Sequence, residues 1–113
     1  MDKDVFDLDA ALGRMEGDRE LLEDMIEIFL GDYPNQVNEI RTAIANDDGE
    51  NLTNAAHALK GSVGNFAAKN LFEIALSLEK DARNLKKDKW SPGLNNLETE
   101  LTKLEAALKA VLS

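Results

Sequence analysis

The sequence has 113 residues, 43% of them hydrophobic, and its 22 acidic and 13 basic residues give a formal net charge of −9. A chain of this length fits one domain with a single modest core, so we expect residues 1–113 to fold as one unit. The negative charge argues against binding to nucleic-acid phosphates or anionic lipid surfaces. The absence of cysteine excludes disulfides, thiolate catalysis and zinc–thiolate sites.

No apolar run approaches the roughly 20 residues that span a bilayer, and the first residues do not resemble a signal peptide. We therefore expect a cytoplasmic protein without direct membrane insertion.

Glycine and proline divide the sequence into helical segments, and no stretch shows the period-two alternation of a strand, which predicts an all-α fold. The first predicted helix covers residues 6–12, with Asp7 as its N-cap, and closes near Gly13. A second predicted helix follows Asp18 and stops near Gly31.

The remaining segments predict four longer helices. Pro34 is expected in the opening turn of one of them, which ends at the turn formed by residues 46–49. Two more are expected over residues 50–64 and 68–86, and Ser91 and Pro92 predict the start of the last one, with Ser91 as its cap. Helices of this length joined by short loops favour an antiparallel up-down four-helix bundle over residues 33–112, with the short helices of residues 6–31 packed as a cap.

The segment around His57, which is the only histidine, carries the chemistry. At about 100° per residue, its apolar positions share one arc, and His57 points roughly 140° away from the centre of that arc, which predicts an exposed ring. The apolar positions are Leu52, Ala56, Leu59, Val63 and Phe66. Imidazole has an ordinary pKa of about 6.5, so histidine offers a neutral nucleophilic nitrogen near neutral pH without a separate base.

Three neighbours share the exposed strip of His57 at helical spacing: Lys60, Gly61 and Gly64. A glycine inside a helix costs roughly 1 kcal/mol against alanine, so local stability does not account for Gly61. A missing side chain beside an exposed imidazole lets another protein bring a phosphoryl donor up to the ring. Lys60 is expected to place its positive charge against phosphoryl oxygens. Gly64 equally fits a helix-terminating residue.

The helix of residues 68–86 is expected to lie antiparallel to the helix of His57. Glu79 neighbours its buried seam and is our candidate for a hydrogen bond to the second ring nitrogen; a simply solvated glutamate is the alternative. Phe72 and Leu76 flank the seam, where they fit either a partner-docking surface or ordinary core.

The segment from Ala56 to Gly61, followed by residues 62–68, resembles the signature of histidine phosphotransfer (HPt) domains. This resemblance covers most of the chain and implies that His57 is phosphorylated, that Lys60 supports the phosphoryl group and that Gly61 clears the approach of a receiver domain. Relatives carry glutamine or glutamate near the position of Glu79. Ala67 departs from the pattern, because many members have glycine there.

The resemblance implies a monomeric phosphoryl carrier in a His–Asp phosphorelay, with receiver domains as partners and a hybrid sensor kinase in cis or in trans. The carrier is not expected to be an enzyme. We expect no cofactor and no metal site in this chain, because clustered carboxylates at metal-ligand spacing are missing, and the Mg²⁺ of the reaction is expected in the partner receiver domain.

Three other functions compete with this one. The same residues fit the phospho-accepting domain of a chemotaxis-type kinase. A structural helical adaptor with an incidental histidine is a second alternative. A hydrolase is the most remote, since the histidine is not accompanied by a nucleophile or a metal site that would complete such a centre.

Overall fold

The computed structural model describes residues 2–113, and helices account for most of them. The α-helices are α1 (Leu8–Arg14), α2 (Arg19–Ala45), α3 (Gly49–Gly64), α4 (Lys69–Arg83) and α5 (Trp90–Leu112), with a short 3₁₀ helix η1 (Lys87–Lys89) before α5. No strand occurs within residues 2–113. The all-α prediction is therefore confirmed.

Aspartates begin three of the helices. The side chains of Asp7, Asp18 and Asp48 accept hydrogen bonds from backbone N–H groups three residues later, at 3.0, 3.0 and 3.1 Å. These bonds satisfy donors that have no partner inside the helix, which fixes where each helix starts. The predicted cap Asp7 is confirmed.

The separation of residues 6–31 from the bundle was wrong, because α2 runs without interruption from Arg19 to Ala45 and includes Gly31 and Pro34. Proline lacks the N–H of an internal helical hydrogen bond, so it favours a helix start. Here the buried face of α2 continues on both sides of Pro34, and its packing outweighs that local cost. The face consists of Leu22, Ile26, Phe29, Val37, Ile40 and Ala43.

The last helix also begins earlier than the sequence suggests. Trp90 is its first residue, Lys89 occupies the cap position without a side-chain hydrogen bond, and Ser91 and Pro92 lie inside the first turn. Pro92 still lies where a missing N–H costs nothing. The indole of Trp90 is buried and donates to the carbonyl of Asp81 at 3.1 Å, which holds this helix start against α4.

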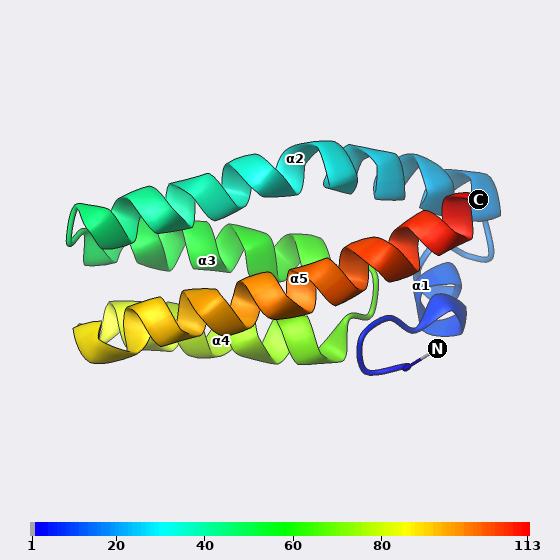
Figure 1. Ribbon diagram of the computed structural model, residues 1–113. Coiled ribbons are helices and arrows are strands. Elements are labelled where there is room, and N and C mark those ends of the chain that lie inside the picture. The colour runs from blue at the N-terminus through cyan, green and yellow to red at the C-terminus, as the bar shows by residue number, and fades with distance from the viewer. Residues whose placement is uncertain (1) are drawn as a thin grey trace.

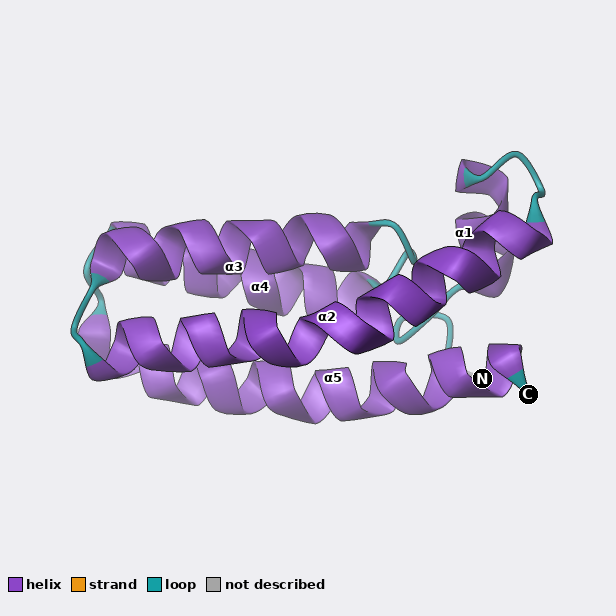
Figure 2. Ribbon diagram, turned by 90° about the horizontal axis from the view of Figure 1, so that it is seen from above, coloured by secondary structure: helices purple, strands orange, loops and turns teal. Residues whose placement is uncertain are grey.

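Four long helices, α2 to α5, lie side by side, and each runs opposite to the helix before it (Figure 1). The view from above shows the same four helices, with α1 set apart at one end (Figure 2). That end also holds both termini and the start of α2. Within the described chain, no helix is long and apolar enough to cross a membrane.

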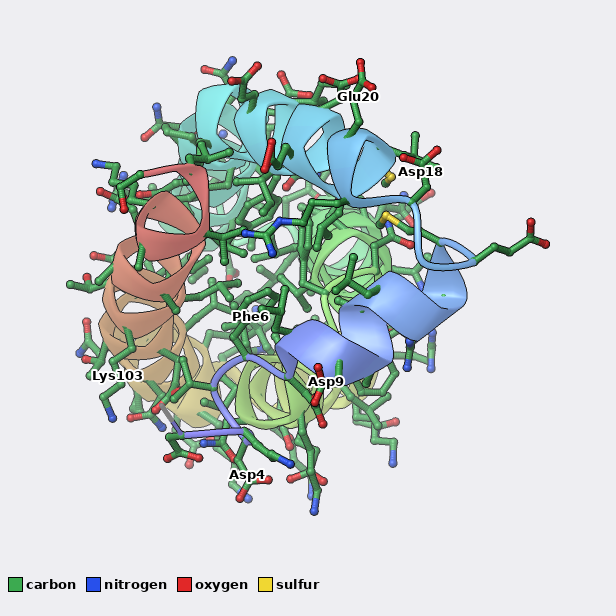
Figure 3. The ribbon with its side chains drawn as sticks, turned by 90° about the vertical axis from the view of Figure 1, so that its right-hand side faces the viewer. Asp4, Phe6, Asp9, Asp18, Glu20 and Lys103 are labelled. Atoms are coloured by element: carbon green, nitrogen blue, oxygen red, sulfur yellow. The ribbon has the colours of Figure 1, made fainter. Side chains whose placement is uncertain are left out.

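The core runs along the axis of the four helices and includes the segment before α2. Phe6, Ala11 and Met15 are buried with the apolar faces of the long helices. Figure 3, an end-on view, shows Phe6 turned inward, while Asp4, Asp9 and Asp18 lie toward the outside. Arg14 of α1 donates to the carbonyl of Gly64 at 2.6 Å, so α1 also contacts the last turn of α3.

Candidate functional site

The face of α3 that carries His57 is turned away from the core, as its periodicity predicts. Leu52, Ala56, Leu59 and Val63 are fully buried, whereas the side chain of His57 is 66% exposed. The neighbouring α4 packs along α3 in the antiparallel sense (Figure 1). An exposed imidazole is therefore mounted on a helix whose other side is fixed in the core.

Glu79 of α4 holds one nitrogen of this ring. Its Oε2 lies 2.9 Å from Nδ1 of His57, and the carboxyl is only 5% exposed. A carboxylate only accepts hydrogen bonds, so Nδ1 carries the proton and Nε2 keeps its lone pair. The predicted contact between Glu79 and the ring is present, and the solvated alternative is wrong.

Lys60 contacts the same carboxyl. Its Nζ donates to Oε1 of Glu79 at 2.7 Å, and its side chain is 18% exposed. The ammonium lies 6.0 Å from the centre of the Phe72 ring. The sequence predicted Lys60 beside His57, which is correct, but did not predict that Glu79 would hold the ammonium.

Arg83 is a third partner of Glu79 that the sequence analysis missed. Its Nη2 donates to Oε2 of Glu79 at 3.1 Å, so Oε2 accepts from both Arg83 and His57. The spacing of four residues between Glu79 and Arg83 is the signal that could have revealed this pair. Arg83 is 60% exposed, much more than Lys60.

The charge of Glu79 depends on its burial and on its contacts with Lys60 and His57. Burial of the carboxyl would raise its pKa, but the hydrogen bonds from Lys60 and His57 and the positive charge of Lys60 outweigh burial and hold the pKa of Glu79 below its ordinary value. Glu79 is therefore ionised at neutral pH. It offers the ring a full negative charge.

Gly61 and Gly64 differ in what surrounds them. A Cβ added at Gly61 would meet nothing within 4 Å, whereas one at Gly64 would contact the ring of Phe72 at 3.7 Å. Phe72 is 38% exposed and Leu76, one turn along α4, is half-buried. The structure thus places open space beside His57 at Gly61, as expected, and brings Phe72 against Gly64 and Lys60.

These groups together suit nucleophilic attack by Nε2 on phosphorus. The free lone pair faces solvent, while the proton on Nδ1 faces a carboxylate that stabilises the positive charge the ring acquires when Nε2 forms a bond. Lys60, one turn along α3 from His57, is the cation on the same helix as the ring and is held by the same carboxylate. Among residues 2–113, no group of three or more potential metal ligands is assembled.

Comparisons with known proteins address the family and the fold of the chain. The family model described as Hpt domain matches residues 24–107. The fold is similar to the HPt domain of a sensor hybrid histidine kinase from Shewanella, with a TM-score of 0.85, 24% sequence identity, and coverage of 98% of this chain and 96% of that chain. None of the curated proteins matches the chain.

The match to the family model covers most of the chain and includes all the residues around His57 that are described above. The chain therefore belongs to the Hpt domain family. It is a phosphotransfer carrier of a phosphorelay.

Proposed function

We propose that this domain accepts a phosphoryl group on Nε2 of His57 from one receiver aspartate and donates it to another. The observation that carries the proposal is the buried carboxylate of Glu79 on Nδ1, at 2.9 Å, behind a ring that is 66% exposed. Lys60 and Gly61 support the phosphoryl group and leave room for the partner, respectively.

The transfer needs no proton acceptor. The lone pair of Nε2 forms the N–P bond while the P–O bond to the receiver aspartate breaks, and that aspartate leaves as a carboxylate. The ring keeps its proton on Nδ1 and becomes a phosphorylated imidazolium, whose positive charge faces Glu79. The reverse step regenerates the neutral ring.

The proposal also covers the setting in which the domain works. The domain acts as a carrier without catalytic activity of its own, as a monomer in the cytoplasm, and needs no cofactor, since the Mg²⁺ of the reaction belongs to the receiver domain. A hybrid sensor kinase, in cis or in trans, is the expected source of the phosphoryl group. The scaffold of the domain is an up-down four-helix bundle of α2 to α5, with α1 as a cap.

Transfer of label from a phosphorylated receiver domain tests this function. The wild-type chain should acquire acid-labile, base-stable label within the time in which the receiver loses it, and His57→Gln should acquire none. Lys103→Gln, which changes an exposed side chain on α5, should behave as wild type. Incubation with ATP alone should give no label.

Two results would contradict the proposal. One is His57→Gln accepting label as well as the wild-type chain, which would make the histidine incidental. The other is labelling of the wild-type chain by ATP alone, which would show a catalytic activity that the proposal denies.

A further inference from the structure

Glu79 has more cationic partners than a single carboxylate needs while the ring is unmodified. Lys60 donates to Oε1 at 2.7 Å and Arg83 donates to Oε2 at 3.1 Å, in addition to Nδ1 of His57 at 2.9 Å. One negative charge is therefore matched by two permanent positive charges. The second cation has a use once a phosphoryl group is present on the ring.

Phosphorylation creates a competition for Lys60. A phosphoryl group on Nε2 attracts the ammonium of Lys60 more strongly than the carboxylate of Glu79 does, because that carboxylate is already shared. If Lys60 turned to the phosphoryl oxygens and Arg83 were absent, the side chain of Glu79, which is 5% exposed, would keep only the phosphorylated ring as a cationic partner. Loss of partners by a buried charge is costly.

Arg83 is placed to remove that cost. It reaches Glu79 from α4, one turn beyond the carboxylate, whereas Lys60 reaches it from α3. The two cations occupy different oxygens, so one leaves without disturbing the other. Arg83 shares Oε2 with His57, which is the oxygen that must stay in place to hold the proton on Nδ1.

We propose that Arg83 is a positioning residue: it keeps Glu79 ionised and bonded to Nδ1 of His57 while Lys60 is engaged by the phosphoryl group. This inference rests on the proposed phosphoryl transfer to His57. It gives the two cations separate tasks, with Lys60 acting on the phosphoryl group and Arg83 acting through Glu79.

The charge of Glu79 tests Arg83 without any phosphotransfer. The pKa of its carboxyl should be measured by ¹³C NMR in the wild-type chain, Lys60→Met, Arg83→Ala and the double variant. The groups that face Glu79 are His57 and Lys60 from α3 and Arg83 from α4. Arg83→Ala should raise the pKa of Glu79 more in the Lys60→Met background than in the wild type, because Arg83 is then the remaining permanent cation.

Phosphotransfer supplies the second measurement. Arg83→Ala should slow acceptance from a phosphorylated receiver about fivefold to tenfold, Arg83→Lys should restore at least half of the wild-type rate, and Arg41→Ala should leave the rate unchanged. Arg41 is a matched control, because it is a half-exposed arginine paired with a carboxylate of another helix, Glu98, at 3.0 Å.

The assignment of Arg83 would be overturned if Arg83→Ala left the pKa of Glu79 unchanged in both backgrounds. It would also be overturned if Arg83→Lys accepted the phosphoryl group as slowly as Arg83→Ala. Absence of transfer to the wild-type chain would instead contradict the proposed function. The two failures are distinguishable because the NMR measurement needs no phosphoryl donor.

Discussion

Glu79 determines the state of the histidine ring. It is buried, it joins α4 to α3, and its carboxyl accepts from His57, Lys60 and Arg83. Replacement by glutamine would retain the shape but remove the charge. Such a variant should therefore separate the electrostatic role of this residue from its packing.

Glu79→Gln should lower the free energy of unfolding at pH 7 by about 1 to 3 kcal/mol, the usual worth of hydrogen bonds to a charged group. The pKa of Glu79 is lowered in the folded protein by Lys60 and His57, against the effect of burial. Its contribution is thus complete above about pH 4.3, where the unfolded chain also ionises, and is lost as the pH falls through the folded value. Urea unfolding between pH 2 and pH 7 measures this.

The free energies of unfolding of the wild type and Glu79→Gln should converge once the pH falls below the lowered pKa of Glu79 in the folded protein. Glu98→Gln, which removes a half-exposed carboxylate on α5, is the control and should change stability by less than about 1 kcal/mol at any pH. A difference in the free energy of unfolding between wild type and Glu79→Gln that stays constant from pH 2 to pH 7 would contradict the negative charge assigned to Glu79.

Ala67 adopts a backbone conformation that its side chain disfavours, with φ of 52° in the turn between α3 and α4. Glycine takes this left-handed conformation without the clash of a Cβ, which costs other residues about 1 kcal/mol or more. This explains in physical terms why a glycine fits the position, where the sequence departs from the HPt pattern.

Ala67→Gly should therefore raise the free energy of unfolding by up to about 1 kcal/mol, as measured by urea denaturation. Ala106→Gly is the matched control, because Ala106 is exposed in the interior of α5, where the same change should cost about 0.5 to 1 kcal/mol. If Ala67→Gly lost as much stability as the control, the backbone of Ala67 would not be strained.

At the level of elements, α3 combines a buried face that is well packed with a strip left open for a partner. Gly61 lies on that strip, and a Cβ built there meets nothing within 4 Å. The glycine is therefore not needed by the fold itself. Its cost to helix stability points to a requirement that lies outside the isolated domain.

Gly61→Ala should stabilise the domain by up to about 1 kcal/mol and slow transfer from a phosphorylated receiver by about tenfold, because the methyl group crowds the approach to His57. Unfolding by urea and label transfer measure the two effects. Gly31→Ala, at an exposed position of α2 with equal free space, should give similar stabilisation with an unchanged rate. Equal rates in the two variants would contradict the proposed clearance.

Periodicity was sufficient to predict the helix of His57 and the orientation of its ring, because both depend on local geometry. It also placed Glu79 near the ring, since antiparallel neighbours bring their seam residues together. The continuity of α2 was missed, because local signals at Gly31 and Pro34 favour a break and only packing along the whole helix overrides them. The sharing of Glu79 by Lys60 and Arg83 was missed because long side chains choose partners in three dimensions.

At the level of the whole molecule, the segment before α2 belongs to the same core as the long helices. The match to the Hpt family begins at residue 24, yet Phe6 is 1% exposed and packs in the common core. The backbone N–H of Asn70 in α4 donates to the carbonyl of Asp4 at 2.9 Å, so the N-terminal segment is also attached to α4. The N-terminal residues should therefore stabilise the domain that they precede.

Phe6→Ala should lower the free energy of unfolding by about 3 to 5 kcal/mol, the usual cost of removing a buried aromatic ring. The transition should remain single, because one core cannot unfold in parts. Ile28→Ala, at a position of α2 that is 64% exposed, should change stability by less than about 0.5 kcal/mol. A separate early transition in Phe6→Ala would show that the first residues form an independent unit.

The phosphorylated atom is the most direct test of the account, because it depends on the proton that Glu79 holds on Nδ1. The ¹⁵N-labelled chain should be phosphorylated by a receiver domain and examined by ¹⁵N and ³¹P NMR. We predict phosphorus bonded to Nε2 of His57, with the proton retained on Nδ1. Phosphorus on Nδ1, or on any other residue, would contradict the account.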